Sequence, residues 1–270
     1  MSIHPTAIVD PSAQIGEGVE IGPFTVIGPH VKIGDGCVIG ASVNITGHTD
    51  IGSGCTIYPG ACIGMPPQDV KFNKDEVTYV KIGKNNIIRE CVTIHAATGA
   101  GNTTVVGDGN FLMAYVHVGH NCVLGSNIIV SNASSFAGHV HIEDNAVVGG
   151  MTGVHQFVRI GCFAMVGGCS RINRDVAPYC TSAGSPERFY GLNVVGLRRN
   201  GIDSASRMAL KRAFAVFCSH TKADAIKLVE QMEITKEVAH LLEFVKAESK
   251  RGICFRRAKA GKGSEAESVL

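Results

Sequence analysis

The sequence has no tryptophan, and aromatic residues make up only 6% of its 270 residues. This composition argues against a globular core built from large rings and favours a narrow core filled by β-branched residues. No run of 18 apolar residues occurs, and the first ten residues contain no apolar signal core. The sequence therefore predicts neither a membrane-spanning helix nor a secretory signal peptide, and we expect a soluble, cytoplasmic protein without stable membrane insertion.

Several common chemical motifs are also missing. The ten cysteines contain no CxxC pair, and the chain has no glycine-rich phosphate loop, no serine nucleophile elbow and no HExxH sequence. We interpret the irregularly spaced cysteines as core thiols in a reducing compartment rather than as a disulfide framework.

A large apolar residue recurs every six residues over two thirds of the chain. The series comprises Ile3, Val9, Ile15, Ile21, Ile27, Ile33, Ile39, Ile45, Ile51, Ile57, Ile63, Ile82, Ile88, Ile94, Val106, Leu112, Val118, Leu124, Val130, Phe136, Ile142, Val148, Val154, Ile160, Val166 and Ile172. Glycine follows 14 of these 26 positions, which suggests corners where φ is positive. The period fits neither an amphipathic helix nor an alternating strand, and it is typical of a parallel β-helix.

Each hexad is expected to supply one short strand and one corner, so that three hexads close a coil and residues 18 apart stack. We predict a mainly β fold, with a parallel β-helix over residues 1–190 and loop insertions near 65–81 and 96–104, where the period breaks. Apolar residues then follow helical spacing, which predicts a C-terminal α-helical domain over 191–255. Residues 256–270 are expected to be disordered.

Charge is distributed unevenly along the chain. Residues 1–170 contain 7 Lys and Arg against 12 Asp and Glu, whereas residues 171–270 contain 18 against 11. The basic C-terminal part can attract an acidic partner, although an ordinary solvated helical surface explains it equally well. We expect no nucleic-acid partner. An open-ended solenoid leaves sheet faces and edges uncovered, and packing around a three-fold axis would cover the faces, so we expect a homotrimer.

The 18-residue spacing brings polar residues to one corner of three successive coils. His120 stacks on Gly138 and then on Gln156, at an inter-coil spacing of roughly 4.8 Å. His139 and His155 belong to the same corner. A further histidine, His117, lies three residues before His120 on the adjoining strand.

Three interpretations of this cluster remain open. The imidazoles could bind zinc, one imidazole could act as a general base, or all could be ordinary surface residues. A glycine beside a base offers its backbone N–H to a developing oxyanion, although the same glycine could simply serve the corner. The combination of His120 with Gly138 favours acyl transfer over metal binding.

The first insertion carries Gln68, Asp69 and Lys71. Loops that project from a regular scaffold are frequent places for function. These side chains could orient a polyol or a phosphate by charge-assisted hydrogen bonds, although charged loop residues are usually only solvated.

Six segments, in order along the chain, resemble the bacterial UDP-N-acetylglucosamine acyltransferases that begin lipid A synthesis. They are IGMPPQDVKF, NNIIRECVTIH, NFLMAYVHVGHNCVLG, FAGHVHI, VGGMTGVHQFVRIG and MVGGCSRINRDVAPY. The resemblance covers nearly the whole chain, and QDVK, MAYVHVGH and GVHQF are much narrower signals than the hexads alone.

This resemblance implies a left-handed parallel β-helix and a trimer with active sites between neighbouring subunits. It also implies transfer of a 3-hydroxyacyl group from acyl carrier protein to the sugar 3-position of UDP-N-acetylglucosamine, without a metal or a diffusible cofactor. By motif, His120 would be the general base and the Gly138 N–H the oxyanion donor. The other implied residues would line the substrate site or contact the sugar nucleotide or the donor: Gln68, Asp69, Lys71, His117, His139, His155, Gln156, Asn193 and Arg199.

Some positions depart from the family pattern. Asn121 follows the proposed base where relatives often have aspartate, and a neutral amide supplies no negative charge to stabilise imidazolium. Val195 and Pro186 replace a glutamate and a histidine of some relatives. Gly168 leaves the acyl groove open, which implies a long donor such as 3-hydroxymyristoyl.

Other functions remain to be distinguished. An N-acyltransferase of the same pathway would carry a globular N-terminal domain, whereas the hexads begin here at Ile3. A trimeric carbonic anhydrase would hold zinc between subunits, and a structural or binding solenoid would have no turnover. The sequence does not distinguish a 3-hydroxyl from a 3-amino acceptor sugar.

Overall fold

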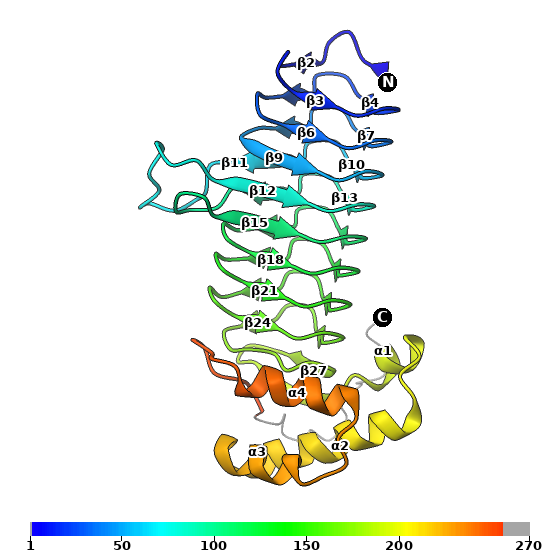
Figure 1. The fold of residues 1–270 in the computed structure, drawn as a ribbon, viewed down its shortest axis with the longest axis vertical. Coiled ribbons are helices and arrows are strands. Elements are labelled where there is room, and N and C mark those ends of the chain that lie inside the picture. The colour runs from blue at the N-terminus through cyan, green and yellow to red at the C-terminus, as the bar shows by residue number, and fades with distance from the viewer. Residues whose placement is uncertain (1, 256–270) are drawn as a thin grey trace.

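The structure, a computed structural model, describes residues 2–255. Residues 2–192 form three sheets that wind as a left-handed β-helix and end in an antiparallel hairpin, and helices close the C-terminal end (Figure 1). In Figure 1 the strands of the front sheet run from left to right as the chain descends and the return strands lie behind, which is the left-handed sense. The predicted disordered tail, residues 256–270, lies outside the described residues.

Short strands, most of them two residues long, stack into the three sheets. Sheet A consists of β1 (Ser2–Ile3), β4 (Glu20–Ile21), β7 (Val38–Ile39), β10 (Thr56–Ile57), β13 (Ile87–Ile88), β16 (Phe111–Leu112), β19 (Ile129–Val130), β22 (Val147–Val148), β25 (Met165–Val166), β27 (Cys180–Ala183) and β28 (Arg188–Leu192). Sheet B consists of β2 (Ile8–Val9), β5 (Val26–Ile27), β8 (Asn44–Ile45), β11 (Cys62–Met65), β14 (Thr93–His95), β17 (His117–Val118), β20 (Ser135–Phe136), β23 (Gly153–Val154) and β26 (Arg171–Ile172). Sheet C consists of β3 (Gln14–Ile15), β6 (Lys32–Ile33), β9 (His48–Ile51), β12 (Tyr79–Ile82), β15 (Thr103–Val106), β18 (Val123–Leu124), β21 (His141–Ile142) and β24 (Arg159–Ile160).

The strand register confirms the 18-residue spacing. Val118 pairs with Phe136 and Leu124 pairs with Ile142, in parallel. The hexad side chains from Ile21 onwards point inward and are buried, so the core is a narrow aliphatic column. The two insertions, now bounded as 66–78 and 96–102, leave the pairing intact and project on the same side of the coil (Figure 1).

The glycines do not have the role expected for them. A glycine directly after the hexad residue lies where the next coil approaches: a Cβ on Gly22 would lie 2.8 Å from the carbonyl carbon of Gly40. Positive φ falls two residues later, and there it is carried largely by other residue types, including Asn121 (58°) and His139 (61°). In each hexad, the position directly after the inward-facing residue is thus the place where the next coil comes close, and the position two residues later is the place where the backbone is left-handed.

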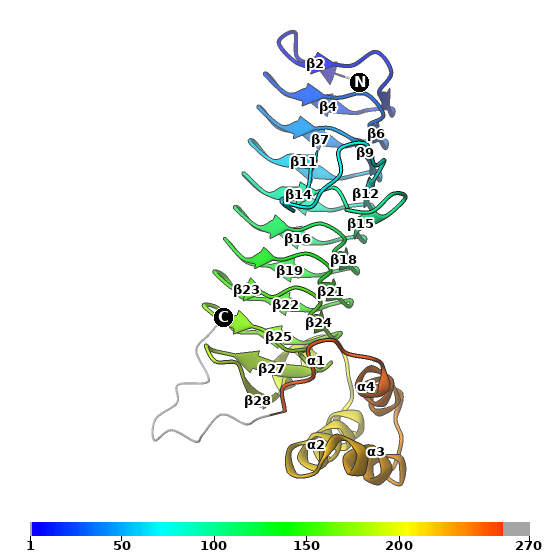
Figure 2. The same ribbon diagram turned by 90° about the vertical axis from the view of Figure 1, so that its left-hand side faces the viewer.

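The C-terminal end is closed by a hairpin and four helices. The helices are α1 (Val194–Arg199), α2 (Ser204–Ser219), α3 (Lys222–Glu230) and α4 (Lys236–Lys246). The side chains of Asp203 and Thr235 cap the N-termini of α2 and α4. Figure 2 shows α4 directly beside the last coils, with α2 and α3 beyond them.

The cysteines follow the expectation of core thiols only in part. Cys37, Cys55 and Cys122 are buried in the coil, whereas Cys91 and Cys169 are exposed. Both exposed residues occupy corner positions with positive φ, where the side chain points away from the core.

Candidate active site

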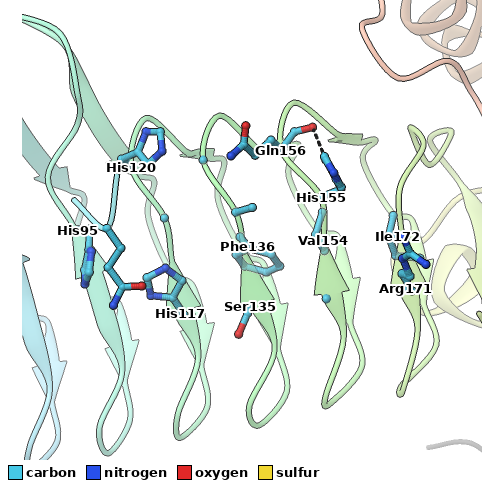
Figure 3. A pocket seen from close by; sticks show the side chains of 15 residues that line it. His95, His117, His120, Ser135, Phe136, Val154, His155, Gln156, Arg171 and Ile172 are labelled. Atoms are coloured by element: carbon cyan, nitrogen blue, oxygen red, sulfur yellow. Dashed lines mark hydrogen bonds between the residues drawn. The ribbon is translucent and has the colours of Figure 1, made fainter. Parts of the chain in front are cut away.

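A cleft of about 480 Å³ runs along the outer face of sheet B and the corner that follows it. The lining residues come from five successive strands and from the first insertion: Gln68, His95, His117, Gly119, His120, Ser135, Phe136, Ala137, Gly138, Gly153, Val154, His155, Gln156, Arg171 and Ile172. Figure 3 shows His120, Gln156 and His155 along the corner, with His117 and Ser135 on the strands beside it. We call this corner, formed by residues 119–122, 137–140 and 155–158, the B–C corner.

The coil register places His120 directly over Gly138. A Cβ built on Gly138 would overlap the His120 imidazole, so this position requires glycine for the ring to lie where it does. The predicted stacking of His120 on Gly138 is therefore what the structure shows. Gln156 and His155 lie one coil further on and line the same cleft.

Asn121 holds the His120 ring through the Nδ1 atom of the imidazole. The Asn121 Oδ1 lies 2.8 Å from His120 Nδ1, and it also accepts a hydrogen bond from the Thr98 N–H at 2.9 Å. The Asn121 Nδ2 donates to the Thr98 carbonyl at 3.1 Å, which fixes the orientation of the amide. With Nδ1–H donating to this oxygen, the lone pair of Nε2 is left facing Gly138.

The backbone N–H of Gly138 has no acceptor among residues 2–255. It lies beside the His120 ring, at the edge of the cleft. An unpaired N–H next to a free imidazole nitrogen is the arrangement that acyl transfer requires, because one group removes a proton and the other receives a developing negative charge.

The neighbouring histidines are held neutral. Burial, followed by the charges of His117 and His120, lowers the pKa of His95 to about 4. Burial and the charge of His120 lower the pKa of His117, whose Nδ1 lies 2.7 Å from the Thr93 hydroxyl. These imidazoles therefore offer hydrogen bonds to a substrate without adding positive charge.

His95 is a cleft residue that the sequence pattern did not single out. It is 6% exposed, stands edge-on to His117 at 4.9 Å between ring centroids, and its Nδ1 has no partner among the described residues. The signal was its position directly after a hexad residue, Ile94. Because the insertion 96–102 follows, Ile94 pairs with Val118, which is 24 rather than 18 residues further on. The 18-residue rule therefore does not place His95 beside His117.

His139 lies at the B–C corner but does not line the cleft. Its ring stacks on Phe157 at 4.7 Å and meets His120 edge-on at 5.2 Å. Lys250, from the segment after α4, lies 4.2 Å from the centroid of Phe157 on the same column. Burial, then the charges of His120 and Lys250, lower the pKa of His139, and Asp69 acts in the opposite direction.

Of the remaining predicted residues, only Gln68 is brought into this cleft. Of the first insertion only Gln68 lines it, while Asp69 accepts a hydrogen bond from the Lys71 N–H at 2.9 Å. Asn193 caps α1 and donates to the Phe163 carbonyl at 2.9 Å, so its amide is already used within the chain. Three other predicted positions are exposed and lie outside the cleft: Lys71, Gly168 and Arg199.

Comparison with known proteins gives a consistent result. A family model described as "Udp N-acetylglucosamine O-acyltransferase; Domain 2" matches residues 175–254, and the bacterial transferase hexapeptide model matches 12–47 and 30–64. An acyl-(acyl-carrier-protein) UDP-N-acetylglucosamine O-acyltransferase of Sulfurovum sp. is 48% identical over 259 residues, covering 95% of this chain and 98% of that protein. The chain belongs to the UDP-N-acetylglucosamine O-acyltransferase family.

Solved structures agree with this assignment to the family. The UDP-N-acetylglucosamine acyltransferase of Bacteroides fragilis superposes with a TM-score of 0.89 at 40% identity, covering 93% of this chain and 99% of that one. The enzyme of Francisella novicida gives 0.90 at 36% identity, covering 93% of each chain. The family resemblance and the β-helix predicted from the sequence are thus confirmed.

Proposed function

We propose that the protein transfers a 3-hydroxyacyl chain from acyl carrier protein to the 3-position of UDP-N-acetylglucosamine, the first step of lipid A biosynthesis. The observation that carries this proposal is the His120 ring, oriented by Asn121 and lying against Gly138, whose N–H has no acceptor among the described residues. The names of the relatives, which cover almost the whole chain, support the substrates.

His120 and Gly138 together supply every proton transfer and the oxyanion contact that the reaction needs. His120 Nε2 removes the proton from the sugar 3-hydroxyl, and the oxygen attacks the thioester carbonyl. The Gly138 N–H donates to the oxyanion, which then collapses and breaks the carbon–sulfur bond. The imidazolium returns its proton to the departing thiolate, so the products are the sugar ester and the free thiol of the carrier.

Asn121 acts in this scheme as a neutral orienting group. It selects the tautomer that presents Nε2 but adds no charge to stabilise the imidazolium. In the proposed site, His117, His155 and Gln156 bind the substrate, Gln68 approaches from the insertion, and Asp69 and Lys71 act on the sugar nucleotide.

The transfer needs no metal or diffusible cofactor, because proton transfer and charge stabilisation are both supplied by the chain. The carbonic anhydrase alternative predicts zinc between subunits that is lost together with activity on chelation, and metal analysis of the purified enzyme distinguishes the two.

We further propose a homotrimer in the cytoplasm. Outward-facing Val38, Ile87 and Ile129 make an exposed apolar stripe along sheet A, which a second copy would cover. No helix within the described part of the chain is long and apolar enough to span a bilayer. The basic C-terminal part would attract the carrier protein, and Asn193 and Arg199 would contact its prosthetic group or the nucleotide.

The direct test is an acyl-transfer assay with UDP-N-acetylglucosamine and a series of 3-hydroxyacyl carrier proteins. We expect turnover with chains near 14 carbons, because Gly168 leaves the groove open. A sharp preference for ten carbons would reject the role of Gly168, and no turnover with any donor would reject the function. A parallel assay with the 3-amino sugar nucleotide decides the acceptor.

A further inference from the structure

A second cluster of reactive side chains lies where α4 packs on the coil. We call the corner that follows sheet C, formed by residues 107–110, 125–128, 143–146 and 161–164, the C–A corner. Glu143 and Cys162 belong to two successive coils of this corner, and His240 comes from α4. We propose that Glu143, Cys162 and His240 bind a zinc ion or a similar borderline-soft divalent cation.

The positions of the donor atoms carry this proposal. A carboxylate oxygen of Glu143, the Cys162 Sγ and a ring nitrogen of His240 all lie within 4.8 Å of one another. His240 Nε2 is 3.3 Å from Glu143 Oε2, whereas Cys162 Sγ lies 3.5 Å from the other ring nitrogen, Nδ1. Ligand atoms around tetrahedral zinc are separated by roughly 3.5 Å, given bonds of about 2.0–2.3 Å. We therefore assign His240 Nε2 as the ligand atom, and a rotation of the Cys162 side chain would bring Sγ to the ion beside it.

The chemical types of the donors select the ion. Thiolate, imidazole and carboxylate are the three ligand classes that zinc takes in proteins, and thiolate disfavours magnesium and calcium. Three protein ligands leave a fourth position for water. Binding forms a zinc–sulfur bond as the thiol S–H breaks, and this proton passes to solvent.

Neighbouring groups already orient two of the three ligands. The Cys162 N–H donates to Glu143 Oε2 at 2.7 Å, and the Tyr179 hydroxyl lies 3.0 Å from His240 Nδ1. Such outer partners fix the direction of ligand side chains at metal sites. The three ligands are each only partly buried, so an ion can reach them from solvent.

A buried carboxylate on the same helix is a second, independent observation. Glu237 is 3% exposed, and its Oε2 has no hydrogen-bond partner among the described residues. Its Oε1 lies 3.7 Å from the exposed Lys236 Nζ. Glu237 precedes His240 by three residues, so both lie on one face of α4, and a cation at the cluster would offset part of the cost of burying this charge.

The proposed ion would join α4 to the last coils of the β-helix. It would connect residues up to 97 positions apart in the sequence, Glu143 and His240. This site is separate from the cleft, and no step of acyl transfer passes through it. Its effect is expected on stability rather than on the chemical step.

The test uses tag-free, metal-depleted full-length protein titrated with Co²⁺ and then with Zn²⁺. We expect one ion per chain, a thiolate-to-cobalt absorption band in the near ultraviolet, and a rise in Tm with Zn²⁺. Cys162→Ala and His240→Ala should weaken Zn²⁺ binding by about a hundredfold or more. Cys169→Ala, at an exposed cysteine seven residues away, is the matched control and should bind normally.

Two outcomes would overturn the proposal. One is the absence of stoichiometric binding and of the cobalt band in the unsubstituted protein, which requires no variant to fold. The other is an unchanged band in Cys162→Ala. In either case the cluster is a hydrogen-bonded group in which His240 links Glu143 to Tyr179 without an ion.

Discussion

The B–C corner and the C–A corner have the same backbone period but opposite uses for their side chains. In the C–A corner, the Ser126 N–H donates to Asp144 Oδ1 of the next coil at 2.7 Å, and the Asp108 N–H donates to the Ser126 hydroxyl at 3.0 Å. In the B–C corner, the equivalent positions are His120, Gly138 and Gln156, whose N–H groups have no acceptor in the described chain.

This difference shows that one corner of the same repeat can stabilise the coil while another corner is left free to bind substrate. The C–A corner pairs its outward N–H groups by placing short polar side chains one coil further on. The B–C corner replaces them with a ring, a glycine and an amide, and leaves the Gly138 N–H available to a substrate. An unpaired polar group costs stability, and such groups collect at functional sites.

Gly138→Ala is expected to have the largest effect of a single added methyl group on activity. The added Cβ overlaps the His120 ring and displaces Nε2 from the N–H beside it. We expect kcat/KM to fall by about a hundredfold or more, the range found when an oxyanion donor is misplaced. Gly28→Ala is the comparison, because Gly28 lies outside the cleft and the nearest atom to its Cβ would be the Thr46 hydroxyl oxygen at 3.2 Å; equal losses in both variants would contradict the role of Gly138.

The pH dependence of stability should also distinguish the site from the rest of the coil. The folded-state pKa of His95 is about 4, below the 6.5 of an ordinary histidine, so the unfolded chain binds the proton first as the pH falls. The stability present above pH 6.5 should therefore be lost between pH 6.5 and 4, by up to about 3 kcal/mol. Urea unfolding of His95→Leu should lack this component, whereas His4→Gln, at an exposed histidine, should retain it.

Asn121→Ala should have a smaller effect. Loss of the acceptor for His120 Nδ1–H leaves the ring free to adopt the other tautomer, and we expect about a tenfold loss in kcat with little change in KM. Asn121→Asp keeps an oxygen at this place and tolerates the positive φ, so it should retain activity. Equal activity in all three proteins would show that the ring needs no orienting group.

The smallest effect is expected in the C–A corner. Asp144→Ala removes the acceptor for the Ser126 N–H, which water can replace because this hydrogen bond is exposed. We expect a loss of about 0.5–1 kcal/mol in the free energy of unfolding and kcat/KM within about twofold of normal. A large loss of activity with unchanged stability would show that the C–A corner also takes part in the reaction, contrary to the structural role assigned to it.

The parts of the site that follow the period could be predicted from the sequence, and the parts that depend on loops could not. The stacking of His120 on Gly138 follows from the 18-residue repeat, because every coil has the same length. Thr98 comes from an insertion outside the repeat, so its contact with Asn121 has no periodic signal. Lys250 reaches Phe157 only through the docking of the helical domain, which no local pattern encodes.

The same limit applies to the glycines and to the second cluster. The hexad pattern predicts where glycine occurs but not whether φ or close approach requires it, and at Gly22 the reason is the neighbouring coil. Glu143 and Cys162 are 19 residues apart and almost stack, yet their relation to His240 depends on where α4 lies. The position of the helical domain on the coil is thus the main feature that the six-residue period does not predict.

The most direct test compares His120→Ala with Ser126→Ala. Both residues stand two positions after an inward-facing aliphatic residue, Val118 or Leu124, one in each corner. We predict that His120→Ala loses about a thousandfold or more in kcat/KM for acyl transfer while Ser126→Ala stays within about twofold, at unchanged folding for both. Near-normal activity of His120→Ala, or equal losses in the two variants, would contradict the account.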